Sequence, residues 1–268
     1  MKLTIIGKDQ NKKGEKQLPS QFNEEYRPDL IRRAVHALQS LRMHRYGSAL
    51  LAGMRSSSRV SKRRRNWRGC YGFGISRVNR KVLSRRGTRM FWVGAFTPQT
   101  TGGRRAHPPK VEKQLDKKIN IKERRKAIRS AISATIVKSL VQERGHHVPE
   151  NYPFIISSDV ETLEKTKDIK DTLSKLGFSE ELDRSLVKSV RAGIGKRRGR
   201  RYKKKKGILV VVGDKCPLLK SAQNISGIDI VEARSLNVEL LAPGAMAGRV
   251  TLWTEKAIDA LEKEKLFQ

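Results

Sequence analysis

Cysteine and long apolar runs are scarce in this sequence, and their scarcity excludes several classes of protein. The two cysteines, Cys70 and Cys216, lie far apart and form no CxxC pair, so we expect neither a disulfide framework nor a zinc ribbon. The longest apolar run, 208–212, is much shorter than the roughly 20 residues that a membrane-spanning helix needs. The chain opens with a short strand-like segment and not with a signal peptide. We therefore expect a reduced, soluble, intracellular protein.

Patterns that carry catalysis or bind cofactors are also missing. The five histidines have no metal-ligand spacing with cysteines or carboxylates, and we expect His146 and His147 in a surface turn before Pro149. The segment 193–196 resembles a phosphate-binding loop only superficially, because Arg197 stands where that loop requires a hydroxyl residue. No nucleophile and base stand in a recognisable pattern. The sequence thus predicts no enzyme, no metal site and no cofactor.

Acidic residues are absent from two long stretches, and this absence determines where the charge lies. The chain has 59 Lys and Arg against 26 Asp and Glu, for a net charge of +33. No carboxylate occurs between Asp29 and Glu112, a stretch with 20 Lys and Arg, or between Asp183 and Asp214, a stretch with 12. The other 156 residues hold 27 basic and 26 acidic groups. This pattern predicts a neutral body with two basic tracts, and a polyanionic partner such as nucleic acid.

The neutral part of the sequence alternates between strand and helix patterns. Asn120 with Glu123 resembles a capping box, Thr254 is a second helix cap, and Gly177 closes a helix. The short apolar strands predict an α/β fold with a mostly parallel sheet that is covered by helices on both faces. We expect strands at 1–6, 154–156, 207–213, 228–231 and 250–253, and helices at 28–41, 120–136, 160–176, from 217 onward and at 254–266.

Residues 51–107 do not follow this alternation. The stretch is rich in Gly, Arg and Ser, shows no sustained period, and follows the first long helix. We expect it to be an extended basic loop that stays disordered until a polyanion neutralises it. If the chain runs fully extended away from the body and back, at about 3.3 Å per residue, the loop reaches at most roughly 95 Å from the body. The globular body would then comprise 1–50 and 108–268, the second part carrying a basic segment at 184–206.

Aromatic residues are interleaved with the arginines of this loop. Arginine side chains suit phosphates, and aromatic rings can stack on unpaired bases, so Trp67 and Tyr71 are expected to contact RNA. For Phe91 and Trp92 the sequence leaves two possibilities open: contact with RNA, or a small hydrophobic patch formed by 90–93 against the body. His107 is expected to stack on RNA or contact it.

Several segments with these features resemble a known family, the large ribosomal subunit protein four in its archaeal and eukaryotic branch. The similar segments appear in the family's order at 26–35, 102–110, 122–132, 191–202, 237–245 and 249–255. The resemblance implies an α/β domain on the outside of the large subunit and a loop threaded through the ribosomal RNA to the nascent-peptide exit tunnel. The chain ends at Gln268 without the long extension that is typical of eukaryotic members, which favours an archaeal source.

The resemblance also implies the function, the partners and the site. The protein would be a structural constituent of the large subunit that aids its assembly, in the cytoplasm. Its partners would be large-subunit ribosomal RNA, neighbouring ribosomal proteins and the nascent polypeptide, with no membrane. The tunnel-lining candidates are Arg68, Tyr71, Gly72, Phe73 and Gly74. The residues expected to bind ribosomal RNA are Arg55, Arg59, Lys62, Arg63, Arg64, Arg65, Trp67, Arg68, Tyr71, Arg77, Arg80, Lys81, Arg85, Arg86, Arg89, Arg104, Arg105, His107, Lys110, Arg191, Lys196, Arg197, Arg198, Arg200, Arg201, Tyr202, Lys203 and Lys204.

Three other functions are weaker interpretations of the same sequence. An RNA-modifying enzyme with a nucleotide-type fold would need a glycine-rich cofactor turn after the first strand. At this position the chain instead has the segment 7–14, with the sequence GKDQNKKG. A DNA-compacting protein would share the basic tracts, and a comparison of ribosomal RNA with duplex DNA at matched salt separates it. Adhesion to an anionic membrane is disfavoured because neither tract forms an amphipathic helix with an apolar face.

Overall fold

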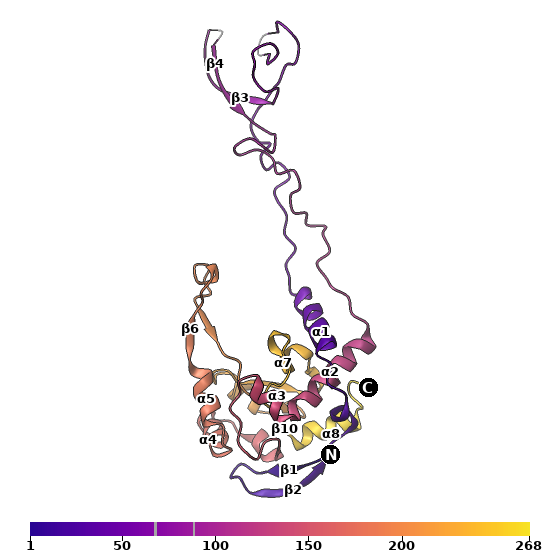
Figure 1. Cartoon of the computed structure of the whole chain (residues 1–268). Coiled ribbons are helices and arrows are strands. Elements are labelled where there is room, and N and C mark those ends of the chain that lie inside the picture. Colours follow the sequence, from indigo (N-terminus) through magenta and orange to yellow (C-terminus); the bar gives the residue numbers. More distant parts are fainter. Residues whose placement is uncertain (67–68, 88) are drawn as a thin grey trace. The chain divides into compact units, whose positions relative to one another are not determined.

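The computed structural model describes residues 1–66, 69–87 and 89–268, which form two compact units. Unit 1 consists of Met1–Arg42 and Asp116–Gln268, and unit 2 of Met43–Leu115. Unit 2 therefore begins earlier and ends later than the loop expected at 51–107. In the chain it lies between the helices α1 and α2 (Figure 1).

A six-stranded sheet forms the centre of unit 1 in the part of the chain that the structure describes. Its order is β2-β1-β5-β10-β8-β9, with β1 and β2 antiparallel and all other neighbours parallel, which confirms the mostly parallel sheet. The edge strand β2 was not expected, because its polar sequence lacks the apolar alternation of a half-buried strand. The strands are β1 Lys2–Ile6, β2 Lys12–Gln17, β5 Ile155–Ile156, β8 Leu209–Val212, β9 Asp229–Glu232 and β10 Thr251–Thr254.

Helices contribute to both faces of this sheet. The α-helices are α1 Pro28–Leu41, α2 Ile121–Ile136, α3 Lys138–Glu143, α4 Thr166–Lys175, α5 Ser179–Leu186, α6 Leu218–Ser221, α7 Val238–Leu241 and α8 Glu255–Lys263. Short 3₁₀ turns are η1 Ser20–Asn23, η2 Ser158–Thr162, η3 Ile194–Lys196, η4 Ala233–Ser235 and η5 Pro243–Ala245. The expected strands and the helices at 28–41, 120–136 and 254–266 are thus confirmed to within a few residues.

Alternate residues of the central strands enter two separate hydrophobic cores. Leu209 and Val211 of β8 belong to one core with residues of α1, α2, α7 and α8. Val210 and Val212 belong to the other core with residues of α4 and α6. This alternation follows from the period of two along a strand. The sheet is therefore covered on both faces, as the continuous apolar strands predict.

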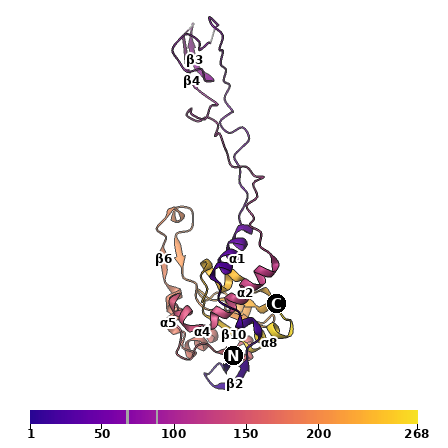
Figure 2. The same ribbon diagram turned by 45° about the vertical axis from the view of Figure 1, so that its right-hand side comes forward.

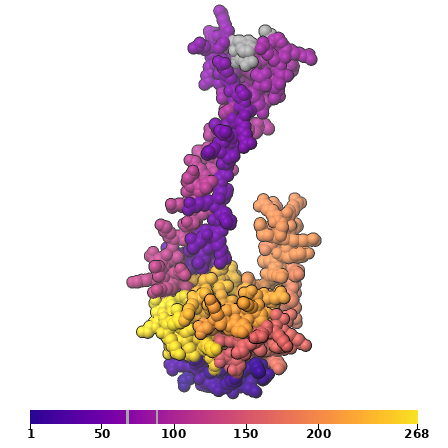
Figure 3. All heavy atoms as spheres, turned by 180° about the vertical axis from the view of Figure 1, so that it is seen from behind, coloured from indigo at the N-terminus to yellow at the C-terminus, as the bar shows by residue number. Residues whose placement is uncertain are grey.

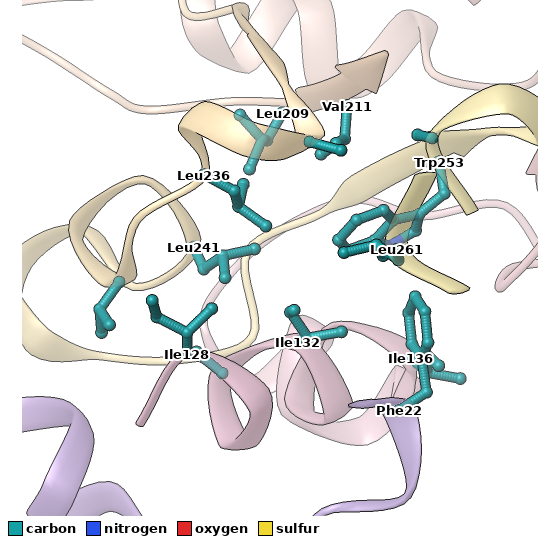
Figure 4. Packing of buried hydrophobic residues seen from close by; sticks show 14 of the residues in the cluster. Phe22, Ile128, Ile132, Ile136, Leu209, Val211, Leu236, Leu241, Trp253 and Leu261 are labelled. Carbon is teal, nitrogen blue, oxygen red and sulfur yellow. The ribbon is translucent and has the colours of Figure 1, made fainter. Parts of the chain in front are cut away.

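The first core joins α2 to the sheet. Figure 4 shows Ile128, Ile132 and Ile136 of α2 facing the side of the sheet that carries Trp253. The ring of Phe22 in η1 meets the Trp253 ring edge to face, with centroids 5.1 Å apart. Ile132 and Trp253 are almost fully buried in the same core, so the burial of apolar surface holds α2 against the strands.

Two expectations about the helix ends are wrong. Asn120 makes no capping hydrogen bond from its side chain, and Glu123 binds Arg33 instead, at 3.0 Å. The helix expected at 160–176 is broken into η2 and α4. The backbone is extended at Leu163 and Lys165, between the two segments, and the buried Oε1 of Glu161 in η2 accepts a 2.7 Å hydrogen bond from the hydroxyl of Thr254. The other two caps are confirmed: Thr254 accepts from the amide of Ala257, and Gly177 follows α4 with a φ of +88°.

A β-hairpin occupies part of unit 2. β3 (Arg80–Arg86) and β4 (Arg89–Gly94) are antiparallel, with Val82 opposite Trp92. The expectation that 51–107 has no regular structure is therefore wrong for 80–94. The reason is that Val82, Phe91, Trp92 and their neighbours have high strand propensity, which the intervening arginines conceal in the sequence.

The two ends of unit 2 run side by side (Figure 2). The amide of Ser48 donates to the carbonyl of Pro109, at 3.2 Å. Further along, a Cβ atom on Gly53 would lie 2.5 Å from the amide nitrogen of Arg104. Gly53 also has a φ of +76°, so glycine is needed where the two segments meet.

The second basic tract forms another hairpin, which belongs to unit 1. β6 (Lys188–Val190) and β7 (Tyr202–Lys204) are antiparallel, with Val190 opposite Tyr202. The hairpin projects from the rest of unit 1 in Figures 1 and 2, and Figure 3 shows it in orange from behind. These two short strands within the basic segment 184–206 are not expected from the sequence and are a finding of the structure.

Candidate nucleic-acid interface

Unit 2 contains 18 Lys and Arg residues and a single carboxylate, Glu112. Most of its predicted RNA-binding side chains are exposed, whereas Tyr71, Arg80 and Lys81 are half-buried. The predicted residues Trp67 and Arg68 lie outside the described residues. The exposed ones are Arg55, Arg59, Lys62, Arg63, Arg64, Arg65, Arg77, Arg85, Arg86, Arg89, Arg104, Arg105, His107 and Lys110.

Two arginines lie against the ring of Tyr71. The guanidinium carbon of Arg77 is 4.6 Å from the ring centroid, and that of Arg64 is 5.5 Å away. Both distances are within the range of a cation–π interaction. A guanidinium that stacks on a ring keeps the N–H groups at its edges available for a phosphate. The three residues together form a small cationic cluster.

Arg80 is bound within unit 2 by several neighbours. Its Nη1 donates to the buried thiol of Cys70 at 3.1 Å, and its Nη2 donates to the hydroxyl of Ser76 at 3.0 Å. Its guanidinium lies 5.3 Å from the centroid of the Trp92 ring, which is half-buried. Arg80 thus connects β3 and β4 with the segment that follows the turn at 71–74 and contains Ser76. The neighbouring Phe91 points outward and is 45% exposed.

The turn at 71–74 presents a narrow and exposed surface. Phe73 is 71% exposed. Gly72 and Gly74 have φ values of +86° and +70°, and a Cβ atom on either would meet nothing within 4 Å. Glycine is required here by the backbone conformation, since the space is open. These residues include four of the five tunnel-lining candidates.

The predicted cations of the second tract surround the β6–β7 hairpin. Backbone hydrogen bonds hold the connection between the strands, where Arg198 and Arg200 both donate to the carbonyl of Gly195. Arg201 lies over the ring of Tyr202, 5.6 Å from its centroid. All nine predicted residues of this tract are exposed, namely Arg191, Lys196, Arg197, Arg198, Arg200, Arg201, Tyr202, Lys203 and Lys204.

A buried ionic cluster fixes the base of this hairpin. Arg184 donates to both carboxylate oxygens of Glu181, at 2.6 and 2.7 Å, and to the carbonyl of Lys206 at 2.7 Å. Nδ1 of His146 lies 2.7 Å from Oε1 of Glu181. Because Arg184 precedes β6 and Lys206 follows β7, one guanidinium joins the two ends of the hairpin. The interpretation of His146 as a surface residue is wrong, since it is only 6% exposed.

The cluster shifts the pKa values of two of its members. Burial alone would raise the pKa of Glu181, but hydrogen bonds from Arg184 and His146 lower that pKa to about 2. Burial lowers the pKa of His146, so its imidazole is neutral in the folded protein near neutral pH. Glu181 is therefore an ionised carboxylate held by one cation and one neutral ring. The helical pattern of 179–186 gives no signal of this burial in the sequence.

A second buried arginine lies near the base of the same hairpin, where the chain leaves β7. Arg249 is fully buried, and its Nη2 donates to Oδ2 of Asp229 at 2.6 Å while its Nε donates to the carbonyl of Gly207 at 2.8 Å. Lys206 binds the same carboxylate at 2.9 Å. Arg249 belongs to the segment 249–255 that carries the family resemblance. The structure gives it an internal position, with its charge paired.

Residues 1–66, 69–87 and 89–268 contain no helix with the length and apolar character needed to cross a membrane. Within the same residues, no three His, Cys, Asp or Glu side chains are grouped so that they could hold a metal ion.

Comparison with known proteins identifies the family. The profile of the Ribosomal protein L4/L1 family matches residues 16–264. Large ribosomal subunit protein uL4 of Nanoarchaeum equitans is 46% identical over 268 residues, which is 100% of each chain. The protein of the same name from Methanocaldococcus jannaschii is 47% identical over 250 residues, 92% of each chain. These relatives are archaeal and are named as parts of a ribosome rather than as enzymes, as the sequence indicates. The chain therefore belongs to the ribosomal protein L4/L1 family.

Proposed function

We propose that the chain is a structural constituent of the large ribosomal subunit and binds its ribosomal RNA through both basic tracts. The observation that carries this proposal is the charge of unit 2, where 18 cations accompany one carboxylate and most of the predicted contact residues are exposed. Such a surface cannot neutralise itself. Packed RNA helices supply phosphates at the density that these cations require.

Counterion release gives the proposal a quantitative form. The two tracts contain 32 Lys and Arg in all. If about a third of them contact phosphate, the affinity for RNA falls with salt at a log–log slope of roughly −7, taking about 0.7 for each contact with a single strand. Titration of the full chain with large-subunit RNA transcripts from 50 to 400 mM salt measures this slope. A slope near zero contradicts phosphate binding by the tracts.

The second part of the proposal concerns the loop 51–107. We propose that the parts of this loop outside the β3–β4 hairpin become ordered on RNA and that ordering costs about 1–2 kcal/mol per residue, which the phosphate contacts offset. Heteronuclear NMR of the free chain tests this. Slow amide exchange and rigid relaxation throughout 51–107 without RNA contradict it, because a preformed loop has no ordering cost left.

The third part concerns the turn at 71–74. We propose that it lines the nascent-peptide exit tunnel, together with Arg68. Its support is the family resemblance and the exposure of the turn, in which Phe73 is 71% exposed and has a glycine on either side. A photo-cross-linking residue at position 73 in ribosomes with a stalled nascent chain should label that chain. The same cross-linker at Leu83, which is also exposed, is the matched control. Equal labelling from both positions contradicts the proposed tunnel contact.

Hydroxyl-radical footprinting of the bound RNA tests the assignment as a whole. We expect protection of large-subunit RNA by the full chain at two separated sets of nucleotides, one for each basic tract. A variant with 197–201 replaced by glycine and serine should lose one set and keep the other. Duplex DNA bound as tightly at matched salt would instead indicate a general polyanion-binding protein.

A further inference from the structure

A cavity of about 610 Å³ lies between the two ends of unit 2. One wall comes from Tyr46 and the other from the segment 105–115. The hydrogen bond from Ser48 to Pro109 and the close contact of Gly47 with Val111 hold these segments together. The volume falls within the roughly 300–1,000 Å³ that is typical of small-molecule sites.

The lining of this cavity combines aromatic rings with cations. Tyr46 is 69% exposed, and His107 is exposed as well, so both rings are accessible to a ligand. Arg105 and Lys110 supply positive charge at the same cavity. Flat rings with neighbouring cations are the features that bind an unpaired base and its phosphate.

Glu112 is the residue that makes the cavity specific. It is the single carboxylate of unit 2, and it lines this cavity. A carboxylate repels RNA phosphates, so its position beside a ligand site calls for a favourable contact with a base. The Watson–Crick edge of guanine has two parallel N–H donors, at N1 and N2, that match the two oxygens of a carboxylate.

We propose that this cavity holds one unpaired guanine nucleotide of an RNA partner. The base stacks on Tyr46 and His107, Glu112 accepts its N1 and N2 protons, and Arg105 and Lys110 bind the flanking phosphates. This inference rests on the proposed function as an RNA-binding protein and adds a base preference to it. The basic tracts alone carry no such preference, because phosphate contacts do not read sequence.

The test uses the full chain and four labelled heptauridylates whose central base is G, A, C or U. We expect the G-centred strand to bind about tenfold more tightly than the U-centred strand, which is typical of one bidentate base contact. Glu112→Gln should reduce this ratio to below about twofold, because an amide has one donor where the carboxylate has an acceptor. Glu150→Gln is the matched control: it removes the same charge from an exposed position of unit 1 and should keep the ratio.

Tyr46 provides a second, independent variant. Tyr46→Phe should keep the preference for guanine, whereas Tyr46→Ala should weaken binding of the G-centred strand about tenfold through lost stacking. The preference for guanine is the ratio of the affinities of two strands for the same preparation. A fraction of protein that does not bind lowers all four apparent affinities alike and leaves this ratio unchanged.

Three outcomes overturn the inference: equal binding of the four strands, an unchanged preference in Glu112→Gln, or tighter binding of a polyglutamate peptide than of the strands. Equal and salt-dependent binding of the strands would refute the guanine site alone. No measurable binding of any strand or of large-subunit RNA would refute the proposed function itself.

Discussion

Arginine has opposite roles in the two units. In unit 1, Arg184 and Arg249 are largely removed from solvent, and each binds a carboxylate and backbone carbonyls. In unit 2, Arg64 and Arg77 lie on an exposed side of Tyr71, in a unit with one carboxylate. The comparison shows that a count of basic residues does not identify an RNA-binding surface. What distinguishes the proposed RNA-binding surface is the absence of carboxylates from the same segment.

The difference also has an energetic side. A buried arginine that loses its carboxylate is left as an uncompensated charge in the low-dielectric interior. The stability of unit 1 therefore depends on each of its buried ion pairs. An exposed arginine that loses its phosphate returns to water at little cost. Loss of a buried charge of unit 1 should therefore lower its stability, whereas loss of an exposed cation, in unit 2 or in the β6–β7 hairpin, should affect binding.

The largest expected effect comes from removal of most of unit 2. Replacing 56–103 with a short Gly-Ser linker removes twelve cations. If about a third of these contact phosphate, the salt slope becomes less steep by about 3 and RNA affinity at 0.15 M salt falls about a hundredfold. Fluorescence anisotropy with labelled large-subunit RNA measures both quantities.

The same deletion tests whether unit 1 folds by itself. The linker can be short because Gly53 and Arg104 already touch. The deletion also removes Trp67 and Trp92, so Trp253 is the one tryptophan left in the sequence, and its fluorescence should be that of a buried indole, since its neighbours all belong to unit 1. A variant without a cooperative unfolding transition would show that unit 2 packs as part of the core, and would remove the basis of the comparison.

The next effect in size concerns the buried cluster. Glu181→Gln leaves Arg184 without its carboxylate, and we expect a loss of about 3 kcal/mol in the free energy of unfolding. Glu180→Gln is the matched control, because Glu180 is exposed and its carboxylate lies 3.5 Å from Nδ1 of His147. The control should stay within about 0.5 kcal/mol of the parent protein in urea unfolding. Similar losses in both variants would refute the structural role of the cluster.

A smaller effect should appear as a pH dependence of unit 1. The pKa of Glu181 is about 2 in the folded protein and 4.5 without its partners, so its stabilisation is complete above pH 4.5 and disappears as the pH falls toward 2. The full difference is about 3 kcal/mol. His146 adds a loss below pH 6.5, because the unfolded chain takes up a proton that the buried ring does not.

Urea unfolding of Glu181→Gln across this range isolates the carboxylate. The parent and the variant should differ most at pH 6 and less at pH 3, since below pH 4.5 the unfolded chain binds a proton that the ionised Glu181 of the folded protein does not. A difference that stays constant from pH 6 to pH 3 would mean that the titration of Glu181 does not govern the acid sensitivity of unit 1.

The smallest effect is that of one exposed cation. Arg198→Gln should make the salt slope of RNA binding less steep by about 0.7, with no change in the unfolding free energy beyond about 0.5 kcal/mol. Arg234→Gln is the matched control, because Arg234 is bound to Glu264 and lies outside the basic tracts. An equal change of slope in both would show that net charge alone, and not its position, determines binding.

The sequence predicts the sheet and the long helices well for a physical reason. Strands such as 209–212 are continuously apolar, and α1 has one apolar face, so burial is written in their periodicity. The hairpin at 80–94 escapes such a prediction because it has no buried face of its own, and exposed arginines interrupt its strand pattern. The break before α4 and the long-range hydrogen bond between Glu161 and Thr254 also escape it, because nothing local in the sequence reveals either.

The candidate interface is predictable in a different way. Its residues follow from charge and from the family resemblance, and their exposure agrees with a binding surface. The cluster of His146, Glu181 and Arg184 is not predictable, because 179–186 has the polar pattern of an ordinary surface helix. The cavity beside Tyr46 is equally hidden, since its two walls are more than fifty residues apart along the chain.

The single guanidinium shared by both ends of the β6–β7 hairpin has a consequence for assembly. Lys206 is followed by Gly207 and Ile208 and then by the strand β8, which pairs with β10 and β9 within the sheet. A ligand that binds the β6–β7 hairpin, orange in Figure 3, therefore also stabilises the contacts of Arg184 at its base, on which the folding of unit 1 depends. Heating the bound protein should melt unit 1 later than heating the free protein does.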